Sequence, residues 1–319
     1  MQAPKGPPYA PQIWQLGGAP EKKVDIPISA VFLALYMGAA AIHMIIFQKN
    51  KKRGHKFLFS GVMFGFCMAR ITTLTLRIAT ICRPTNVRLA IAASIFVALG
   101  VLLIFVINLL WTQRIVRSLH PTIGWHRAFS LFLLSLYALI VFTLIIVIIA
   151  TIQSFYTLNT NTRRIDRDLQ LYASTLLALI SFLPLPILAI ALLAPHQKSP
   201  HADSFGAGRF RTKIIILTTG TFLVCLGACY RCGTSWLAPV PRTHPLPGYF
   251  SKAAFYMMDF GVEIFTIYLY ALMRVDRRFH VPDGARGAGS YRMAVGVRMG
   301  VRRIRRSASA SEILCEEGR

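Results

Sequence analysis

Charged residues are scarce in this sequence, and acidic residues are the scarcest of all. Only 15% of the 319 residues are charged and 55% are hydrophobic, whereas soluble domains average about 25% charged and about 45–50% apolar residues. This balance excludes an intrinsically disordered chain and argues against a soluble enzyme or a disulfide scaffold. The 12 acidic residues face 36 lysines and arginines, giving a net charge of +24. We attribute this excess to basic loops and a basic tail beside a membrane, and expect no nucleic-acid partner.

The motifs of metal, nucleotide and nucleophile chemistry are absent too. The eight histidines form no HxxxH or HExxH pair, and the sequence has no P-loop or GxGxxG motif. No Ser-His or Cys-His pair is placed to make a nucleophile. Cys229 and Cys232 have CxxC spacing, but they stand alone in a hydrophobic run, which is not typical of a zinc or redox site. The sequence therefore predicts no enzyme activity, no metal and no cofactor.

Long hydrophobic runs are what the sequence has instead. Residues 128–162 hold no ionised side chain over 35 positions, and a membrane-spanning helix needs about 20 such residues. Helices are expected because each backbone N–H and C=O must be satisfied within its own segment in a bilayer. Two prolines at positions 184 and 186 should kink the fifth helix. We predict an all-α polytopic membrane protein, a seven-transmembrane helix bundle with spans at 26–47, 57–80, 89–111, 128–152, 171–194, 214–237 and 253–273.

The distribution of lysine and arginine predicts the orientation of this bundle. The loops after the first, third and fifth spans, together with the C-terminal tail, carry 23 of these residues, and the opposite side carries 10. We therefore expect the N-terminus outside and the C-terminus inside. The predicted parts are a short extracellular segment (1–25), the transmembrane domain (26–273) and a basic cytoplasmic tail (274–319). The expected location is the plasma membrane rather than an internal membrane.

Only five strongly charged residues fall within the predicted spans: Arg70, Arg77, Arg231, Asp259 and Glu263. A charge at a helix centre costs about 2.5–3.5 kcal/mol, so these side chains should face the bundle interior and pair. Arg70 and Glu263 both lie about 15 Å below the outer ends of their helices, which predicts an ion pair between them. Two interpretations stay open for the group: a ligand-binding pocket in the outer half of the bundle, or a purely structural ion-pair network.

The tail and two cysteines give further candidate sites. Residues 292–306 alternate apolar and basic faces at helical spacing, which predicts an amphipathic helix against anionic lipids of the inner leaflet. A basic tail without structure is the alternative. The residues expected to contact the leaflet are Arg298, Arg302, Arg303, Arg305 and Arg306. Cys82 and Cys232 both lie near the outer ends of their helices, so they are a candidate disulfide if the second and sixth spans are neighbours.

Five segments carry a resemblance to a known family. They are PPYAPQIW at 7–14, HKFLFSGVMFGFCMARI at 55–71, GWHR at 124–127, QSFYTLNTNTRRIDRDLQLY at 153–172 and RVDRRFHVPDG at 274–284. These segments resemble a fungal family of seven-helix membrane proteins of unknown function, some members of which are labelled family C-like G-protein-coupled receptor proteins. The resemblance implies a fungal source and seven helices, without an established ligand or activity.

Three functions are compatible with these patterns. The leading hypothesis is an orphan, receptor-like seven-helix protein that binds an unknown ligand in the outer half of the bundle, with a G protein as one candidate partner. The alternative is a membrane transporter or lipid translocator similar in topology to fungal lipid-translocating exporters. A third is a structural membrane scaffold. An internal inverted repeat would favour transport, and none is evident in the sequence.

Overall fold

The computed structural model describes residues 6–54, 57–195, 205–282, 284, 285, 287, 290 and 291, except the side chain of Leu99. Within these residues the regular structure is helical, apart from one isolated β-bridge between Ile13 and Pro241. The described chain contains seven helical segments long and apolar enough to cross a membrane. The predicted class, an all-helical protein with seven candidate spans, is therefore confirmed.

The seven segments include three that are assembled from more than one helix. In chain order they are α1 (Lys22–Lys52), α2 (Leu58–Cys82), α3 with α4 (Val87–Gly100 and Leu102–Leu119), α6 (Arg127–Tyr156), α7 with α8 (Thr160–Phe182 and Pro184–Leu193), α9 (Phe210–Trp236), and a seventh helix made of α10 (Lys252–Phe255), η2 (Tyr256–Gly261) and α11 (Val262–Leu272). Three short helices lie outside the spans: α5 (Pro121–Gly124), η1 (Gly248–Phe250) and α12 (Val275–Arg278). Each predicted span lies within one of the seven segments, apart from a single overhanging residue at one end of four of them, and the segments extend beyond the spans by up to 11 residues at the start of α7.

Two of the spans are interrupted, for different reasons. The break between α7 and α8 falls at the predicted prolines, which remove backbone donors from the helix. The break between α3 and α4 was not predicted, and it lies beside Gly100. There the guanidinium of Arg70 packs so closely that a Cβ on Gly100 would overlap it. Arg70 also donates to the carbonyl of Val97 at 3.1 Å, so it satisfies one of the acceptors left free where α3 ends.

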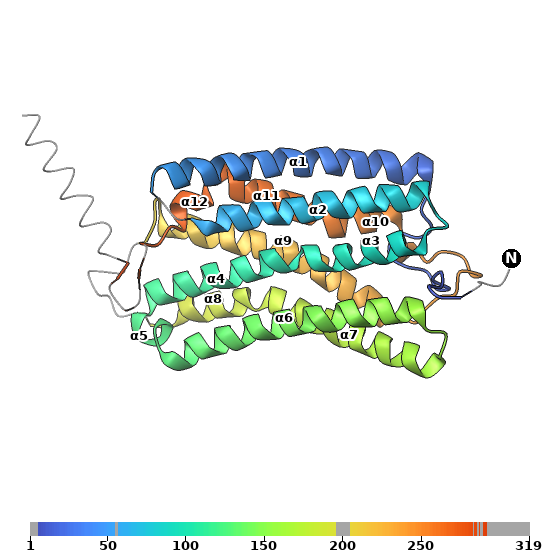
Figure 1. Cartoon of the computed structure of the whole chain (residues 1–319). Coiled ribbons are helices and arrows are strands. Elements are labelled where there is room, and N and C mark those ends of the chain that lie inside the picture. The colour runs from blue at the N-terminus through green and yellow to red at the C-terminus, as the bar shows by residue number, and fades with distance from the viewer. Residues whose placement is uncertain are drawn as a thin grey trace, which may run out of the picture.

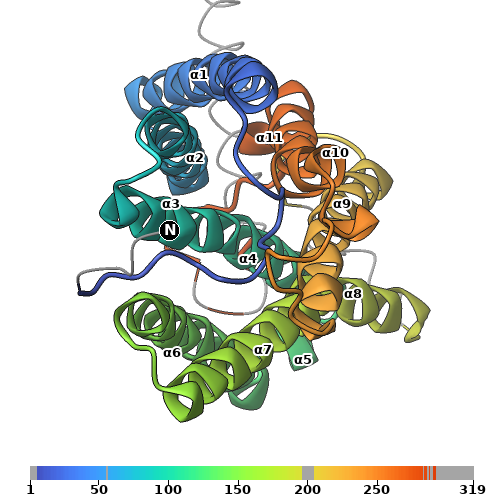
Figure 2. The same cartoon turned by 90° about the vertical axis from the view of Figure 1, so that its right-hand side faces the viewer.

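The helices run side by side in one bundle (Figure 1). Viewed from the end in Figure 2, α1, α2 and α11 lie on one side, α6 and α7 on the other, and α4 and α9 between them. We call the end that carries the N-terminus and the loops at 83–86, 157–159 and 237–251 the N-terminal side, and the opposite end the C-terminal side. The exposed residues of α6 are mostly apolar, with the charged Arg127 at its start and Ser135 and Gln153 as polar exceptions, as expected of a surface that meets lipid.

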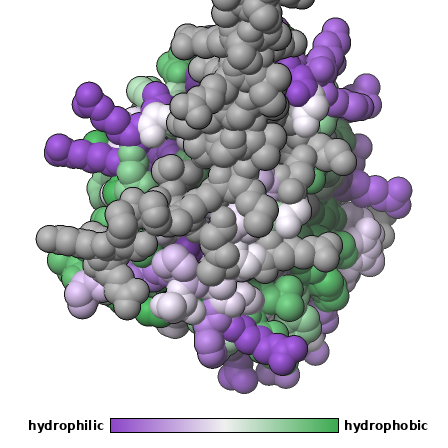
Figure 3. All heavy atoms as spheres, turned by 90° about the vertical axis from the view of Figure 1, so that its left-hand side faces the viewer, coloured by the Kyte–Doolittle hydropathy of each residue, from purple (hydrophilic) through white to green (hydrophobic). Residues whose placement is uncertain are grey.

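The C-terminal side is closed by aromatic packing. Trp111 of α4 stacks on Phe279 with ring centroids 4.5 Å apart, and meets the edge of Tyr270 at 4.8 Å. Arg114 donates to the carbonyl of Phe279. Hydrophilic side chains surround this end (Figure 3). The described lysines and arginines exposed there are Lys49, Lys51, Lys52, Arg53, Arg127, Arg209, Arg211 and Arg277.

The carboxylate of Asp276, which accepts several hydrogen bonds, lies on this same side, outside the spans. Asp276 of α12 accepts two hydrogen bonds from Arg274 and one from Asn50 of α1, each at 3.0 Å. Burial alone would raise the pKa of Asp276, but these bonds outweigh it and hold the pKa below its ordinary value of 3.8. Asp276 is therefore charged at neutral pH and ties α12 to α1.

The N-terminal strap, residues 6–20, lies across the opposite end of the bundle. It pairs with the loop between α9 and α10 through a bond from the backbone N–H of Trp14 to the carbonyl of Val240 (2.9 Å), and another from Arg242 to Gln12 (3.0 Å). Gly17 has a φ of 82° and a Cβ there would lie 3.0 Å from Phe255 and 3.1 Å from the guanidinium of Arg77. The strap therefore rests directly on polar and aromatic side chains of α2 and the seventh helix.

Candidate functional site

The seventh helix is irregular where its charged residues begin. Between α10 and α11, residues Tyr256–Gly261 form a π-helical turn, which contains Asp259. Such turns insert an extra residue into a helix and are frequent at functional sites. Gly227 of α9 allows close packing here, because a Cβ at this position would overlap the carbonyl oxygen of Met258. The turn and the adjoining part of α11 present Tyr256, Asp259 and Glu263 to the bundle interior.

Arg70 and Glu263 form the ion pair that their depths predict. Arg70 Nε donates to Glu263 Oε2 at 2.6 Å and Nη2 donates to Oε1 at 2.5 Å, with the two side chains 0% and 1% exposed. The hydroxyl of Tyr36 donates a further bond to Oε2 at 3.2 Å. With the bond from Arg70 to Val97, both charges have well-formed partners from α1, α2, α3 and α11. This two-point geometry is the strong form of an arginine–carboxylate interaction.

The second pair on the seventh helix, Arg231 with Asp259, is much less complete. Arg231 Nε lies 3.4 Å from Asp259 Oδ1, and Asp259 is 0% exposed. Among the described residues, neither oxygen of Asp259 accepts a hydrogen bond, and Nη1 of Arg231 is buried without an acceptor. The side chain of Arg231 is 17% exposed, so it connects the buried carboxylate with the protein surface. We call Arg231 and Asp259 the polar centre.

Arg77 takes part in a third cluster, whose acid lies outside the predicted spans. Arg77 Nη2 lies 3.6 Å from Oδ1 of Asp25, and Lys252 Nζ lies 3.0 Å from its Oδ2. The hydroxyl of Tyr256 donates to Asp25 Oδ1 at 2.9 Å. Because α1 begins at Lys22, Asp25 is helical and fully buried. The signal for it was available in the sequence, since Asp25 shares a helical face with Ser29 and Tyr36.

A row of polar residues on α1 faces the seventh helix and α12 at seven-residue spacing. Ser29 bonds to Tyr256, Tyr36 to the carbonyl of Phe260, His43 to the carbonyl of Ile267, and Asn50 to Asp276. A seven-residue repeat returns to nearly the same face of a helix. The row therefore fixes the register of α1 against the seventh helix along the full depth of the bundle.

The predicted disulfide between Cys82 and Cys232 is wrong for this structure, where both thiols are free. The reason is the helix arrangement: the end of α9 packs against α7, and Cys232 contacts the hydroxyl of Thr175 at 3.7 Å. Cys82 is exposed at the end of α2. Five arginines expected to contact the inner leaflet lie outside the described residues, as does the amphipathic helix predicted at 292–306. They are Arg298, Arg302, Arg303, Arg305 and Arg306.

The chain matches a model of one protein family. Residues 121–207 and 206–280 match the family described as "Protein of unknown function (DUF3112)", which together is just over half of the sequence. The chain belongs to this family. No curated protein and no solved structure matches it. The DUF3112 match includes Arg231, Asp259 and Glu263, whereas Arg70 and Arg77 precede it. The uncharacterised status of DUF3112 agrees with the resemblance seen in the sequence, while the fungal source and the receptor label stay predictions.

Proposed function

We propose that this DUF3112 protein is a receptor-like membrane protein that binds a small polar ligand at the polar centre, approached from the N-terminal side. The observation that carries the proposal is the buried carboxylate of Asp259, which sits on a π-helical turn and accepts no hydrogen bond from the described residues. A purely structural pair would be expected to resemble Arg70–Glu263, because an unsatisfied buried charge is strongly destabilising.

The chemistry of the polar centre restricts the group it can bind. The two oxygens of Asp259 require a donor, and Nη1 of Arg231 requires an acceptor. A hydroxyl group supplies both, because it donates one hydrogen bond and accepts others. We therefore favour a small ligand with a hydroxyl group. The N-terminal strap would then cover the ligand from outside through its contacts with Arg77 and Phe255.

A binding screen on the purified, full-length protein tests this proposal. We expect at least one compound in a library of small hydroxylated metabolites to raise the melting temperature, by about 4 °C at saturation. Asp259→Asn and Arg231→Gln should abolish the shift, and Arg164→Gln, a matched change on the exposed face of α7, should retain it. The proposal fails if no compound shifts the melting temperature or if Asp259→Asn keeps the full shift.

The proposed orientation, with the N-terminus outside and the C-terminus inside, rests on the basic residues of the C-terminal side. Thr160 lies at the exposed start of α7 on the N-terminal side, and Thr122 is exposed on α5 at the opposite end. An impermeant thiol reagent should label Thr160→Cys in intact cells and label Thr122→Cys only after permeabilisation. Labelling of Thr122→Cys in intact cells would reverse the orientation. Ser118 is unsuitable as a reporter because it is buried.

The remaining expectations also stay proposals. We propose a plasma-membrane location, a fungal source, contact of the tail with anionic lipids, and a G protein as candidate partner, with no enzyme activity. A transporter or lipid translocator remains the alternative function, and a structural scaffold the third. Release of a bound compound to the opposite side of a proteoliposome would favour the transporter over the receptor.

A further inference from the structure

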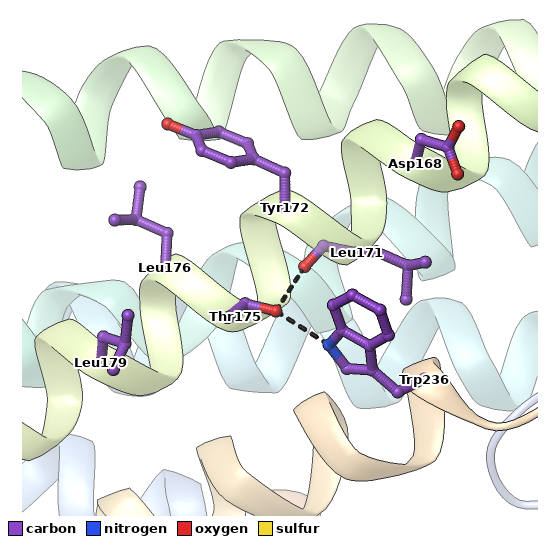
Figure 4. A pocket seen from close by; sticks show the side chains of 7 residues that line it. All are labelled: Asp168, Leu171, Tyr172, Thr175, Leu176, Leu179 and Trp236. Atoms are coloured by element: carbon purple, nitrogen blue, oxygen red, sulfur yellow. Dashed lines mark hydrogen bonds between the residues drawn. The ribbon is translucent and has the colours of Figure 1, made fainter.

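A groove of about 420 Å³ runs along α7 in the N-terminal half of the bundle (Figure 4). Its lining is mostly apolar: Leu171, Tyr172, Thr175, Leu176 and Leu179 of α7, Trp236 of α9, and Asp168 at the end nearest the N-terminal side. The indole N–H of Trp236 donates to the hydroxyl of Thr175 at 2.9 Å, and that hydroxyl donates to the carbonyl of Leu171 at 2.8 Å. These two bonds hold one wall of the groove in place.

The groove faces the lipid rather than the bundle interior. Leu179 is 61% exposed, Trp236 60% and Tyr172 45%, and all three are large residues. From Leu171 to Leu179 the wall is about 12 Å long at the rise of an α-helix. It lies at the start of the predicted span 171–194, with Asp168 in the interfacial layer. Since water is excluded from the hydrocarbon region, only an apolar chain can occupy this wall.

The charge of Asp168 indicates which polar group the ligand with this apolar chain carries. Its carboxylate is exposed and makes no ion pair or hydrogen bond with any described residue, and the same is true of Arg164 one turn nearer the aqueous phase. Asp168 is the charged residue that lines the groove, whereas Arg167, its neighbour in the sequence, donates to the carbonyl of Leu237 at 3.2 Å. A phospholipid carries its phosphate next to its chains, and Asp168 would repel it. An amphiphile with a protonated amine attached directly to its chain places a positive charge beside Asp168.

We propose that the groove between α7 and α9 binds a single-chain amphiphile whose polar end is a protonated amine, with the ammonium group at Asp168 and the chain along Leu171–Leu179 and Trp236. This site is separate from the polar centre, and the proposal does not depend on it. Trp236 lies beside Leu171 and Thr175, and the ring of Tyr172 points away from Asp168 (Figure 4), so recognition of the ammonium group rests on Asp168.

Quenching of Trp236 by a brominated chain tests the proposal directly. The full-length protein in phosphatidylcholine nanodiscs is titrated at pH 7 with a bromine-labelled long-chain primary alkylamine. Trp14, Trp111 and Trp125 also fluoresce, so the signal of Trp236 is the difference between the wild-type protein and Trp236→Phe. We expect this difference signal to fall with saturation. The N-acetylated amine and the fatty acid of the same chain length, which lack the positive charge, should require at least about fivefold higher concentrations.

Substitutions at Asp168 then assign the selectivity to that residue. Asp168→Asn should raise the half-saturating concentration of the amine by about fivefold, close to the effect of one exposed ion pair, and leave that of the acetylated amine unchanged. Asp168→Glu should keep the preference for the amine. Arg164→Gln is the matched control and should preserve or strengthen amine binding, because it removes a nearby positive charge.

Two outcomes would overturn the proposal. If the three probes quench Trp236 equally in the wild-type protein, the groove is a general lipid contact without a preference for amines. If none of them quenches Trp236, no chain enters the groove. The comparison of probes needs only the wild-type protein and Trp236→Phe, so it stands even if a variant of Asp168 does not fold.

Discussion

The two ion pairs on the seventh helix lie one helical turn apart and differ sharply in how they are made. Glu263 receives two hydrogen bonds from Arg70 and one from Tyr36. Asp259 is equally buried, yet its approach to Arg231 is 3.4 Å and it accepts no hydrogen bond from the described residues. Both carboxylates are buried and both are paired with an arginine. They differ in the number of hydrogen bonds that the described residues donate to them.

This difference assigns different roles to the two regions. Breaking a buried pair by removing one partner strands the other charge, which is the signature of a structural lock. The Arg70–Glu263 region joins α1, α2, α3 and α11 in this way. Asp259 of the polar centre lies on a π-helical turn, and the donor and acceptor positions that no described residue fills suit the polar centre to bind a ligand. Three sets of substitutions test this difference, given in order of decreasing expected effect.

Removing one member of the Arg70–Glu263 pair should have the largest effect. Arg70→Met or Glu263→Gln should each lower the free energy of unfolding by about 3–5 kcal/mol, because each leaves an uncompensated buried charge. The double variant should regain part of that loss. The measurement is reversible unfolding by SDS titration in mixed micelles, with folded yield as a second readout. Fully additive losses in the double variant would show that the two residues do not interact.

Gly100→Ala should have an intermediate effect through the same pair. In most helices alanine is the more stable residue by about 1 kcal/mol. Here the added methyl group would overlap the guanidinium of Arg70, which Glu263 holds in place, so we expect a loss of about 1–3 kcal/mol. Gly65→Ala on α2, where a Cβ meets no other atom within 4 Å, is the control and should be neutral or stabilising. Equal effects at both glycines would contradict the packing around Arg70.

Changes at the polar centre should have the smallest effect on stability, and the loss should be larger at Arg231 than at Asp259. Asp259→Asn removes a buried charge to which no described residue donates a hydrogen bond, so the free energy of unfolding should stay within about 1 kcal/mol of wild type or rise. Arg231→Gln leaves Asp259 charged without a counterion and should be the more destabilising of the two. The same SDS titration measures both. A loss at Asp259→Asn as large as that at Glu263→Gln would show that the polar centre is also a structural lock.

The sequence predicts the spans well because membrane insertion depends on hydrophobic length, which is a local property. It also predicts that Arg70 meets Glu263, because helix rise places both at one depth and few charges are available to pair. Asp25 was not identified from the sequence as the partner of Arg77, for a related reason. The predicted first span began at the first uninterrupted apolar residue, Ile26, whereas α1 begins one turn earlier at Lys22.

Other features depend on contacts that no local pattern encodes. The π-helical turn lies where Gly227 of α9 packs closely against Met258, and the break after α3 lies where Gly100 packs against Arg70. The disulfide prediction assumed that the second and sixth spans are neighbours at their ends, and Cys232 instead faces Thr175 of α7. Helix neighbours in a bundle are set by packing over the whole chain, so the spacing of cysteines could not reveal them.

The central claim, that one pair is a structural lock and the other is free to bind, is tested most directly by two double-mutant cycles run under identical conditions. One cycle combines Arg70→Met with Glu263→Gln, and the other combines Arg231→Gln with Asp259→Asn. The measured quantity is the coupling free energy within each pair, from unfolding by SDS titration. We predict about 3 kcal/mol for the first cycle and less than about 1 kcal/mol for the second. Equal coupling in the two cycles, or stronger coupling in the second, would contradict the account.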